Sequence, residues 1–239
     1  MEPFNREDIS DPLADFLPTY EPENLPRLPA KRLYRQRAHC NPWSDHSFFP
    51  PKKPSEIDWS QHYPSPVSSL SDELIRHADI GCGYGGLLFH LSTIFPNIRS
   101  IGIEIRIKVC DYVQEKIRAL REQNPGEYEN IACIRTNAMR FLPNYFNQSQ
   151  LHKIFFLYPD PHFKRVKHKW RIITQSLLAV YAFLLIPTGR LYSATDVPEL
   201  AEWIVAHLRH HQLFKEICYT RFECPANKQG LEAIQLLKG

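Results

Sequence analysis

Apolar residues along this chain recur in two patterns, as short continuous runs and as longer stretches with helical spacing. The short runs are typical of buried strands, which we predict at 77–80, 98–103, 131–135, 153–158, 189–194 and 216–222. Helical spacing is clearest in 106–123, through Val109, Tyr112, Val113, Ile117 and Leu120, and in 198–210, through Leu200, Trp203, Ile204 and Leu208. Because strands and helices alternate, we predict an α/β fold with a doubly wound, mainly parallel sheet.

Composition divides the chain into three parts. Residues 1–29 are rich in Asp, Glu and Pro, which predicts a disordered acidic tail. Residues 30–72 form a basic N-terminal arm followed by an irregular lead-in that is rich in Pro and Ser. The alternating pattern occupies 73–239, and the chain of 239 residues with 43% hydrophobic content is long enough to bury one sizeable core.

Several classes of protein are disfavoured. The chain has no long uncharged apolar stretch and no signal-peptide pattern at its start, so we expect a soluble intracellular protein without a membrane partner. The 6 cysteines form no CxxC pair, which indicates reduced thiols rather than disulfides or a zinc site. No metal is expected at Asp160 and His162, because two ligands at that spacing are too few. Cys82 lacks a neighbouring base that would make it a nucleophile.

The positive charge is concentrated in two segments. KRLYRQRAH (31–39) contains Tyr34 among its cations, and FKRVKHKWR (163–171) contains Trp170. Cations attract phosphates and an aromatic ring can stack on a base, so the two segments favour a nucleic-acid partner over a merely solvated surface or an import signal. We predict phosphate contacts for the cations of the second segment, Lys164, Arg165, Lys167, Lys169 and Arg171.

A glycine loop, DIGCGYGG, follows the first predicted strand. Gly81, Gly83 and Gly86 satisfy GxGxxG, the pattern of dinucleotide-binding proteins, whereas Gly81, Gly83 and Gly85 satisfy GxGxG, the pattern of S-adenosylmethionine enzymes. Glu104 follows the second strand, where an acid binds the ribose of either ligand. The glycines and this acid therefore leave both ligands open.

Other strand ends carry polar residues that bear on the ligand. Asp79 would repel a pyrophosphate and attract the positive charges of S-adenosylmethionine, which favours the methyl donor, unless Asp79 only caps a turn. Asn137 and Ala138 follow the third strand, where a side-chain amide and a backbone N–H could hold the adenine edge. After the fourth strand, prolines on both sides of Asp160 stiffen the backbone, which indicates catalysis or base recognition rather than a plain turn.

Longer segments resemble a known family. The segments KRLYRQRAHCNPWSDH, ADIGCGYGGLL, GIEIRIKVCDYVQEKI, NIACIRTNAM and FFLYPDPHFKRVKHKWRII are similar to those of eukaryotic tRNA (guanine-N7)-methyltransferases, the catalytic subunits that modify a guanine of the tRNA variable loop. The resemblance implies a class I methyltransferase fold over 73–239, with S-adenosylmethionine as methyl donor. It implies donor contacts from Gly81, Glu104, Arg106, Asn137, Ala138 and Leu157 and an active-site role for Asp160. It also implies nuclear location and a heterodimer with a non-catalytic WD-repeat β-propeller subunit.

The C-terminal segment departs from the family. Where the family has a Thr- and Glu-rich segment and a final strand, this chain reads CPANKQGLEAIQLLKG, with Asn227, Lys228 and Gln229 in place of the Thr and acids. We carry over no ligand contact from this loop. We expect the closing strand of the seven-stranded sheet to be missing, which would leave 216–222 as an exposed edge.

The reaction itself suggests what Asp160 does. Guanine N7 carries an exposed lone pair, so methylation needs an in-line approach to the donor and no general base. A carboxylate can accept hydrogen bonds from N1–H and N2–H of guanine and stabilise the charge that develops on the ring. We predict this role for Asp160. The alternatives are a catalytically weak, methyltransferase-like tRNA-binding subunit, for which the altered C-terminus argues, and an NAD-linked oxidoreductase.

Overall fold

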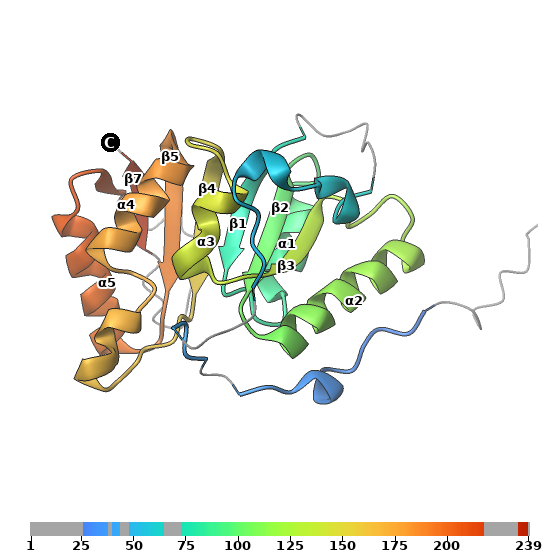
Figure 1. Cartoon of the computed structure of the whole chain (residues 1–239), viewed down its shortest axis with the longest axis horizontal. Coiled ribbons are helices and arrows are strands. Elements are labelled where there is room, and N and C mark those ends of the chain that lie inside the picture. Colours follow the sequence, from blue (N-terminus) through green and yellow to red (C-terminus); the bar gives the residue numbers. More distant parts are fainter. Residues whose placement is uncertain (1–25, 38–39, 44–47, 65–72, 218–233, 239) are drawn as a thin grey trace, which may run out of the picture.

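A mixed seven-stranded sheet forms the centre of the molecule (Figure 1). The computed structural model describes residues 26–37, 40–43, 48–64, 73–217 and 234–238. The strands lie in the order β3-β2-β1-β4-β5-β7-β6. Their bounds are β1 Ile75–Ile80, β2 Arg99–Glu104, β3 Ile131–Arg135, β4 Leu151–Leu157, β5 Leu185–Ala194, β6 Phe214–Ile217 and β7 Ile234–Lys238.

The parallel half of the sheet contains its most buried strands. All of β2 is buried, and β1 is buried except for Arg76. Asp79 of β1 lies opposite Gly102 of β2 on one side and Phe155 of β4 on the other. The chain runs outward from β1 to β3 and then returns to β4, so the strand order reverses beside β1. Ligands of such sheets bind beyond the carboxyl ends of the strands at this reversal.

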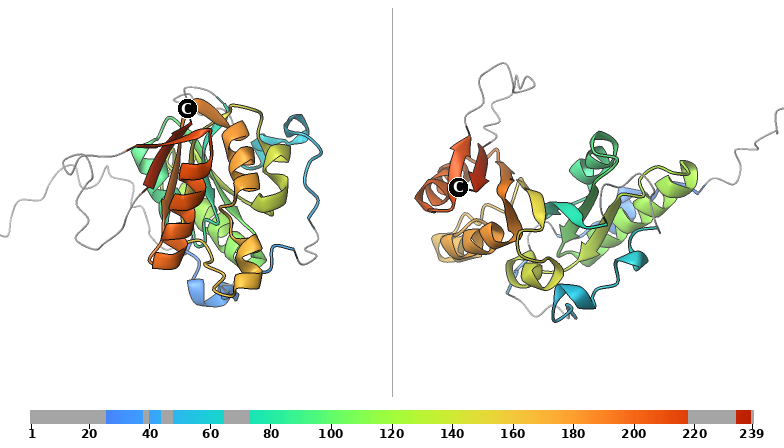
Figure 2. Two further views of the ribbon diagram at one scale, coloured as in Figure 1. Left: turned by 90° about the vertical axis from the view of Figure 1, so that its left-hand side faces the viewer. Right: turned by 90° about the horizontal axis from the view of Figure 1, so that it is seen from above.

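Helices cover both faces of the sheet, as Figure 2 shows in its view from above. Their bounds are α1 Gly86–Ile94, α2 Ile107–Gln123, α3 Ala138–Tyr145, α4 Gln175–Leu184 and α5 Pro198–His210. Buried residues of α3, α4 and α5 share one hydrophobic cluster with the strands, and those of α1 and α2 form a second cluster with Ile131 and Cys133 of β3. This two-sided arrangement confirms the predicted doubly wound α/β fold.

The amphipathic patterns also place the helices correctly. In α2 the predicted apolar positions Val109, Tyr112, Val113 and Ile117 are buried, and in α5 so are Leu200, Ile204 and Leu208. Within the part of the chain that the structure describes, no helix is long and apolar enough to cross a membrane.

The prediction of a missing closing strand is wrong. β7 lies between β5 and β6 and pairs antiparallel with both, with Leu237 opposite Arg190 and Lys215. Strand pairing uses backbone N–H and C=O groups, so a changed loop sequence before residue 234 does not prevent it. β6 pairs with β7 on one side and is still the outer strand of the sheet. The remainder of the predicted 216–222 strand lies outside the described residues, as do Asn227, Lys228 and Gln229.

The N-terminal arm packs against the sheet and α2. It contains the short 3₁₀-helices η3 Lys31–Tyr34, η4 Pro54–Glu56 and η5 Trp59–Gln61. Tyr63 is fully buried, and its hydroxyl donates to the carbonyl of Ser100 at 2.9 Å. The ring of Tyr34 meets that of Tyr112 edge-on, with 5.6 Å between the centroids. Most of the predicted acidic tail, residues 1–25, lies outside the described residues.

Candidate active site

One cavity lies at the carboxyl ends of the strands, and the seven residues predicted for donor binding and catalysis all line it. Gly81 follows β1, Glu104 ends β2 and Arg106 precedes α2. Asn137 and Ala138 begin α3, Leu157 ends β4 and Asp160 lies in the loop beyond it. All seven line the same cavity. The geometry confirms that they lie together, while the role of each in binding or catalysis stays a prediction.

The backbone of the glycine loop distinguishes the two patterns that its sequence allows. Gly81, Gly83 and Gly85 all have positive φ angles, of 72°, 55° and 77°. Gly85 is also confined, because a Cβ there would lie 2.8 Å from the ring of Phe89. Gly86, by contrast, begins α1, and a Cβ there would meet nothing within 4 Å. Positions 81, 83 and 85 therefore require glycine and position 86 does not, which matches the GxGxG pattern rather than GxGxxG.

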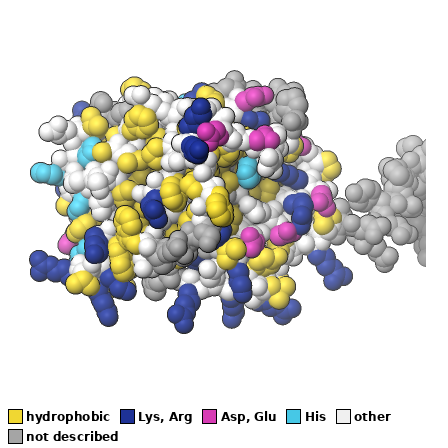
Figure 3. Space-filling view, in the orientation of Figure 1, with side chains coloured by type: hydrophobic (Ala, Val, Ile, Leu, Met, Phe, Trp, Pro, Cys, Tyr) yellow, Lys and Arg dark blue, Asp and Glu magenta, His cyan; other side chains and the backbone are white. Residues whose placement is uncertain are grey.

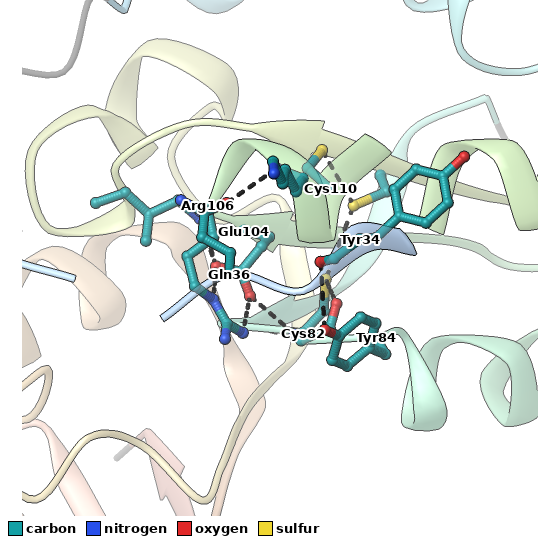
Figure 4. A network of polar contacts seen from close by, with 11 residues as sticks. Tyr34, Gln36, Cys82, Tyr84, Glu104, Arg106 and Cys110 are labelled. Atoms are coloured by element: carbon teal, nitrogen blue, oxygen red, sulfur yellow. Dashed lines mark hydrogen bonds and ion pairs between the residues drawn. The ribbon is translucent and has the colours of Figure 1, made fainter. Parts of the chain in front are cut away.

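Glu104 is the most heavily hydrogen-bonded carboxylate of the site (Figure 4). It accepts from the backbone N–H groups of Gly83, Ile105 and Arg106 at 3.1, 2.9 and 3.0 Å. The Arg106 guanidinium adds two further bonds, and this hydrogen bonding raises the pKa of Arg106. A carboxylate has about four acceptor sites. Ribose hydroxyls can therefore bind Glu104 only if the Arg106 side chain moves aside.

Asp79 lies behind the wall of the cavity, one residue before Ile80, which lines it. The side chain is buried, and loss of hydration, helped by the charge of Glu104, raises the pKa of Asp79 to about 7. Because Glu104 is already paired with Arg106, it is the ionised form of Asp79 that would favour a cation beside this wall. This agrees with the charge argument made from the sequence.

Asn137 uses its side chain for structure. Its Oδ1 accepts from the N–H of Met139 at 3.0 Å and caps α3, and its Nδ2 donates to the carbonyl of Pro42 at 2.6 Å. The side chain is buried, and each polar atom makes one hydrogen bond, so one N–H and one lone pair are left for the adenine edge, and this contact stays a prediction. Ala138 remains in the cavity wall to meet that edge.

The loop after β4 has an unusual backbone around Asp160. Tyr158 and His162 on either side of PDP have positive φ angles of 52° and 45°, which cost energy in residues other than glycine. The N–H of His162 donates to Asp160 Oδ1 at 3.3 Å, and the His162 ring meets Trp170 edge-on. Strain of this kind persists only where the surroundings hold the loop in place.

A second hollow adjoins the first one. The two share Cys40, Asp160, His162 and Trp170, and the second adds Asn41, Phe163, Lys164 and Lys167. Asp160 thus lies at the boundary between the first cavity and a hollow lined by aromatic and cationic side chains. Cys40 and Pro42 come from the arm and His162 follows PDP, and sequence reasoning assigned none of the three to the site, although all lie within segments that resemble the family.

The basic segment 163–171 divides into two groups. Lys164, Arg165, Lys167 and Lys169 are exposed, as predicted for phosphate contacts. Arg171 is only 2% exposed and bonds to Pro161 and Glu199, so its predicted phosphate contact is wrong. Figure 3 shows Lys and Arg side chains gathered along the lower edge of the molecule, where η3 and η6 (Arg165–Trp170) lie in Figure 1.

Three buried cysteines, Cys82, Cys110 and Cys133, lie in contact with one another and form no disulfide. The sulfur of Cys133 lies 3.8 Å from that of Cys82 and 3.6 Å from that of Cys110. These hydrogen bonds raise the pKa of the Cys133 thiol. Among the described residues, no group of His, Cys, Asp and Glu could hold a metal ion.

Strand order, glycine loop and cavity together define a class I methyltransferase, in which an antiparallel β7 lies between β5 and β6. A family described as "Putative methyltransferase" matches residues 74–233. A tRNA (guanine-N(7)-)-methyltransferase of Brugia malayi is 55% identical over 196 residues, 82% of this chain and 74% of that protein. One of Drosophila mojavensis is 57% identical over 193 residues, 80% of this chain and 77% of that protein. The chain belongs to the tRNA (guanine-N(7)-)-methyltransferase family.

Among solved structures, the aminoglycoside resistance methyltransferase NpmB1 is similar at a TM-score of 0.49 and 15% identity, over 72% of this chain and 90% of that chain. The fold assignment rests on the strand order of the sheet and on the family match. Family membership removes the oxidoreductase alternative.

Proposed function

We propose that this protein transfers a methyl group from S-adenosylmethionine to N7 of a guanine in the variable loop of tRNA. The observation that carries the proposal is the position of Asp160, at the boundary between the cavity that contains the predicted donor contacts and the hollow lined by Phe163, Lys164, Lys167 and Trp170. Relatives about 55% identical are named for this reaction, which supports the same conclusion.

The residues of the first cavity suit the methyl donor. S-adenosylmethionine supplies an electrophilic methyl group on a positively charged sulfur. We propose that the positive charge of the donor favours ionisation of Asp79 behind the cavity wall, while Leu157 and Ala138 give the cavity apolar surface. We propose that Glu104 binds the ribose after Arg106 has moved aside, and that Gly81 allows close approach of the donor to the loop.

Asp160 then orients the base. N1–H and N2–H of guanine lie on one edge, and a carboxylate that accepts from both directs N7 away from itself, toward the donor. The negative charge also stabilises the positive charge that the ring gains as the new C–N bond forms. The guanine reaches this position by leaving its stack in the tRNA. The aromatic side chains of Phe163 and Trp170 border the hollow that would receive it.

The partner and the location follow from the resemblance to eukaryotic enzymes. We propose a heterodimer with a non-catalytic WD-repeat β-propeller subunit that helps to hold the tRNA, and a nuclear location. Co-purification of such a subunit, with higher tRNA affinity in its presence, would support the heterodimer. A monomer with full activity would contradict it.

Transfer of labelled methyl groups from S-adenosylmethionine to bulk tRNA tests the activity. The native protein should form 7-methylguanine, and Asp160→Asn should lower turnover by about 10²- to 10³-fold, the scale of one lost electrostatic contact to the transition state. Donor affinity should barely change. Asp111→Asn, on the exposed side of α2, is the matched control. Native protein that binds tRNA without transfer would instead indicate a catalytically weak subunit.

A further inference from the structure

Arg171 is a cation in an unusual place for a tRNA-binding segment. It follows η6, whose cations face solvent, yet it is among the largest side chains that are completely buried. A buried guanidinium needs partners for its donors, and these partners indicate what the residue does.

The partners of Arg171 connect the Asp160 loop to α5. Its Nε donates to the carbonyl of Pro161 at 2.8 Å, and its Nη2 donates to Glu199 Oε1 at 2.7 Å. Glu199 belongs to the first turn of α5, and the bond from Arg171 lowers the pKa of this carboxyl group. The guanidinium also lies over the ring of Trp203, 4.7 Å from its centroid.

This contact acts where the backbone needs support. Pro161 follows Asp160 directly and precedes His162, which has a positive φ angle. The carbonyl of Pro161 is therefore part of the strained loop, and a charged donor at 2.8 Å holds it in one orientation. The backbone N–H of Arg171 also closes η6 by donating to the carbonyl of His168 at 3.0 Å.

We propose that Arg171 is a positioning residue for the methyl transfer, which holds Asp160 in its catalytic orientation by clamping Pro161 to α5. This inference rests on the proposed role of Asp160. Arg171 touches neither base nor phosphate in this arrangement. Its planar guanidinium directs one N–H to the carbonyl of Pro161 and another to the carboxylate of Glu199. The single ammonium group of a lysine cannot reproduce this geometry.

Arg171→Lys is the primary test, because it keeps the positive charge and removes the fork. We expect kcat to fall about 10- to 100-fold, in proportion to the loss of one or two charge-assisted hydrogen bonds. The salt dependence of tRNA binding should stay unchanged. Lys215→Gln, an exposed cation of β6 outside the basic segment, is the control and should change neither kcat nor the slope of log affinity against log salt. Full kcat in Arg171→Lys would overturn the proposal.

A double-mutant cycle separates positioning from a general loss of structure. If Arg171 acts through Asp160, Arg171→Lys should cost almost nothing in the Asp160→Asn background. Equal costs in both backgrounds would overturn the proposal. If Asp160→Asn alone is fully active, it is the proposed role of Asp160 that fails.

If Arg171→Lys does not fold, a second variant, Glu199→Ala, tests the proposal. Glu199→Ala removes the distant end of the clamp from a carboxylate side chain that is 55% exposed, so folding should tolerate it. We expect a smaller drop in kcat, about 3- to 10-fold, equivalent to one weakened hydrogen bond. An unchanged kcat in this variant would also overturn the proposal.

Discussion

Arg106 occupies the carboxylate of Glu104 with a two-pronged ion pair, Nε to Oε1 at 3.1 Å and Nη2 to Oε2 at 2.8 Å. The acid predicted to bind ribose is thus engaged by a side chain predicted to contact the same ligand. Donor binding must exchange one set of hydrogen bonds for another, so the net gain from Glu104 is smaller than a free carboxylate would give.

Removing the charge of Glu104 should nevertheless weaken donor binding. Glu104→Gln leaves one acceptor oxygen and frees Arg106, so we expect the donor Kd to rise about 10- to 100-fold, the range for a lost charged hydrogen bond. Isothermal titration with S-adenosylhomocysteine measures it. Glu115→Gln, on α2 and away from the cavity, is the control, and tRNA affinity should stay constant in both variants. An unaltered donor Kd would show that the ribose binds elsewhere.

Donor binding should depend on pH through Asp79. Burial raises its pKa to about 7 in the free protein, so ionising it costs stability as pH rises from about 4 through 7. A positively charged donor favours the ionised form, and donor affinity should therefore increase between about pH 6 and pH 8. Titrations in buffers of different ionisation enthalpy would count the released proton. Asp79→Asn should bind the donor with much less pH dependence, and an identical pH profile would contradict the linkage.

His77 should make the fold sensitive to mild acid. The ring is fully buried, and burial, with smaller contributions from Lys153 and His152, lowers its pKa to about 3. Because the unfolded chain binds this proton near pH 6.5, the contribution of His77 to the free energy of unfolding should fall below that pH, by up to about 1.4 kcal/mol per pH unit, while Asp79 contributes a slope of opposite sign.

Urea unfolding between pH 5 and pH 7.5 measures this effect. His77→Gln should lose less stability than the native protein as pH falls, although it is less stable at neutral pH, whereas the exposed His210→Gln should keep the native pH dependence. Equal slopes in all three proteins would show that another group controls the acid response.

The exposed cations of the basic segment should set the salt dependence of tRNA binding. Alanine at Lys164, Arg165, Lys167 or Lys169 removes one phosphate contact each. Each substitution should lower the slope of log affinity against log salt by about 0.7 to 0.9 and leave donor affinity unchanged. Filter binding at several salt concentrations provides the slopes, with the exposed Lys215→Ala of β6 as control. A fall in donor affinity would place the segment in the donor site instead.

Sequence reasoning succeeded where a residue's role follows from its own chemistry and its place at a strand end. The buried stripe of α2 and the cavity residues after β1, β2 and β4 are of this kind, because local pattern and parallel topology determine where they lie. It failed where a role depends on a distant partner. The burial of Arg171 against Glu199 arises from tertiary packing, and β7 forms through backbone pairing that leaves little trace in a short apolar segment.

The place of β7 affects how the protein can fold while it is being made. The five parallel strands β3-β2-β1-β4-β5 are synthesised first and can assemble on their own connections. β6 leaves the ribosome before β7. Because β6 pairs only with β7 in the sheet, it has no strand partner until β7 has been synthesised. Until residues 234–238 emerge, β5 also presents an open edge to other nascent chains. Completion of the sheet therefore requires the synthesis of residues 234–238, and a ribosome that stalls before them would leave β5 and β6 without their common partner.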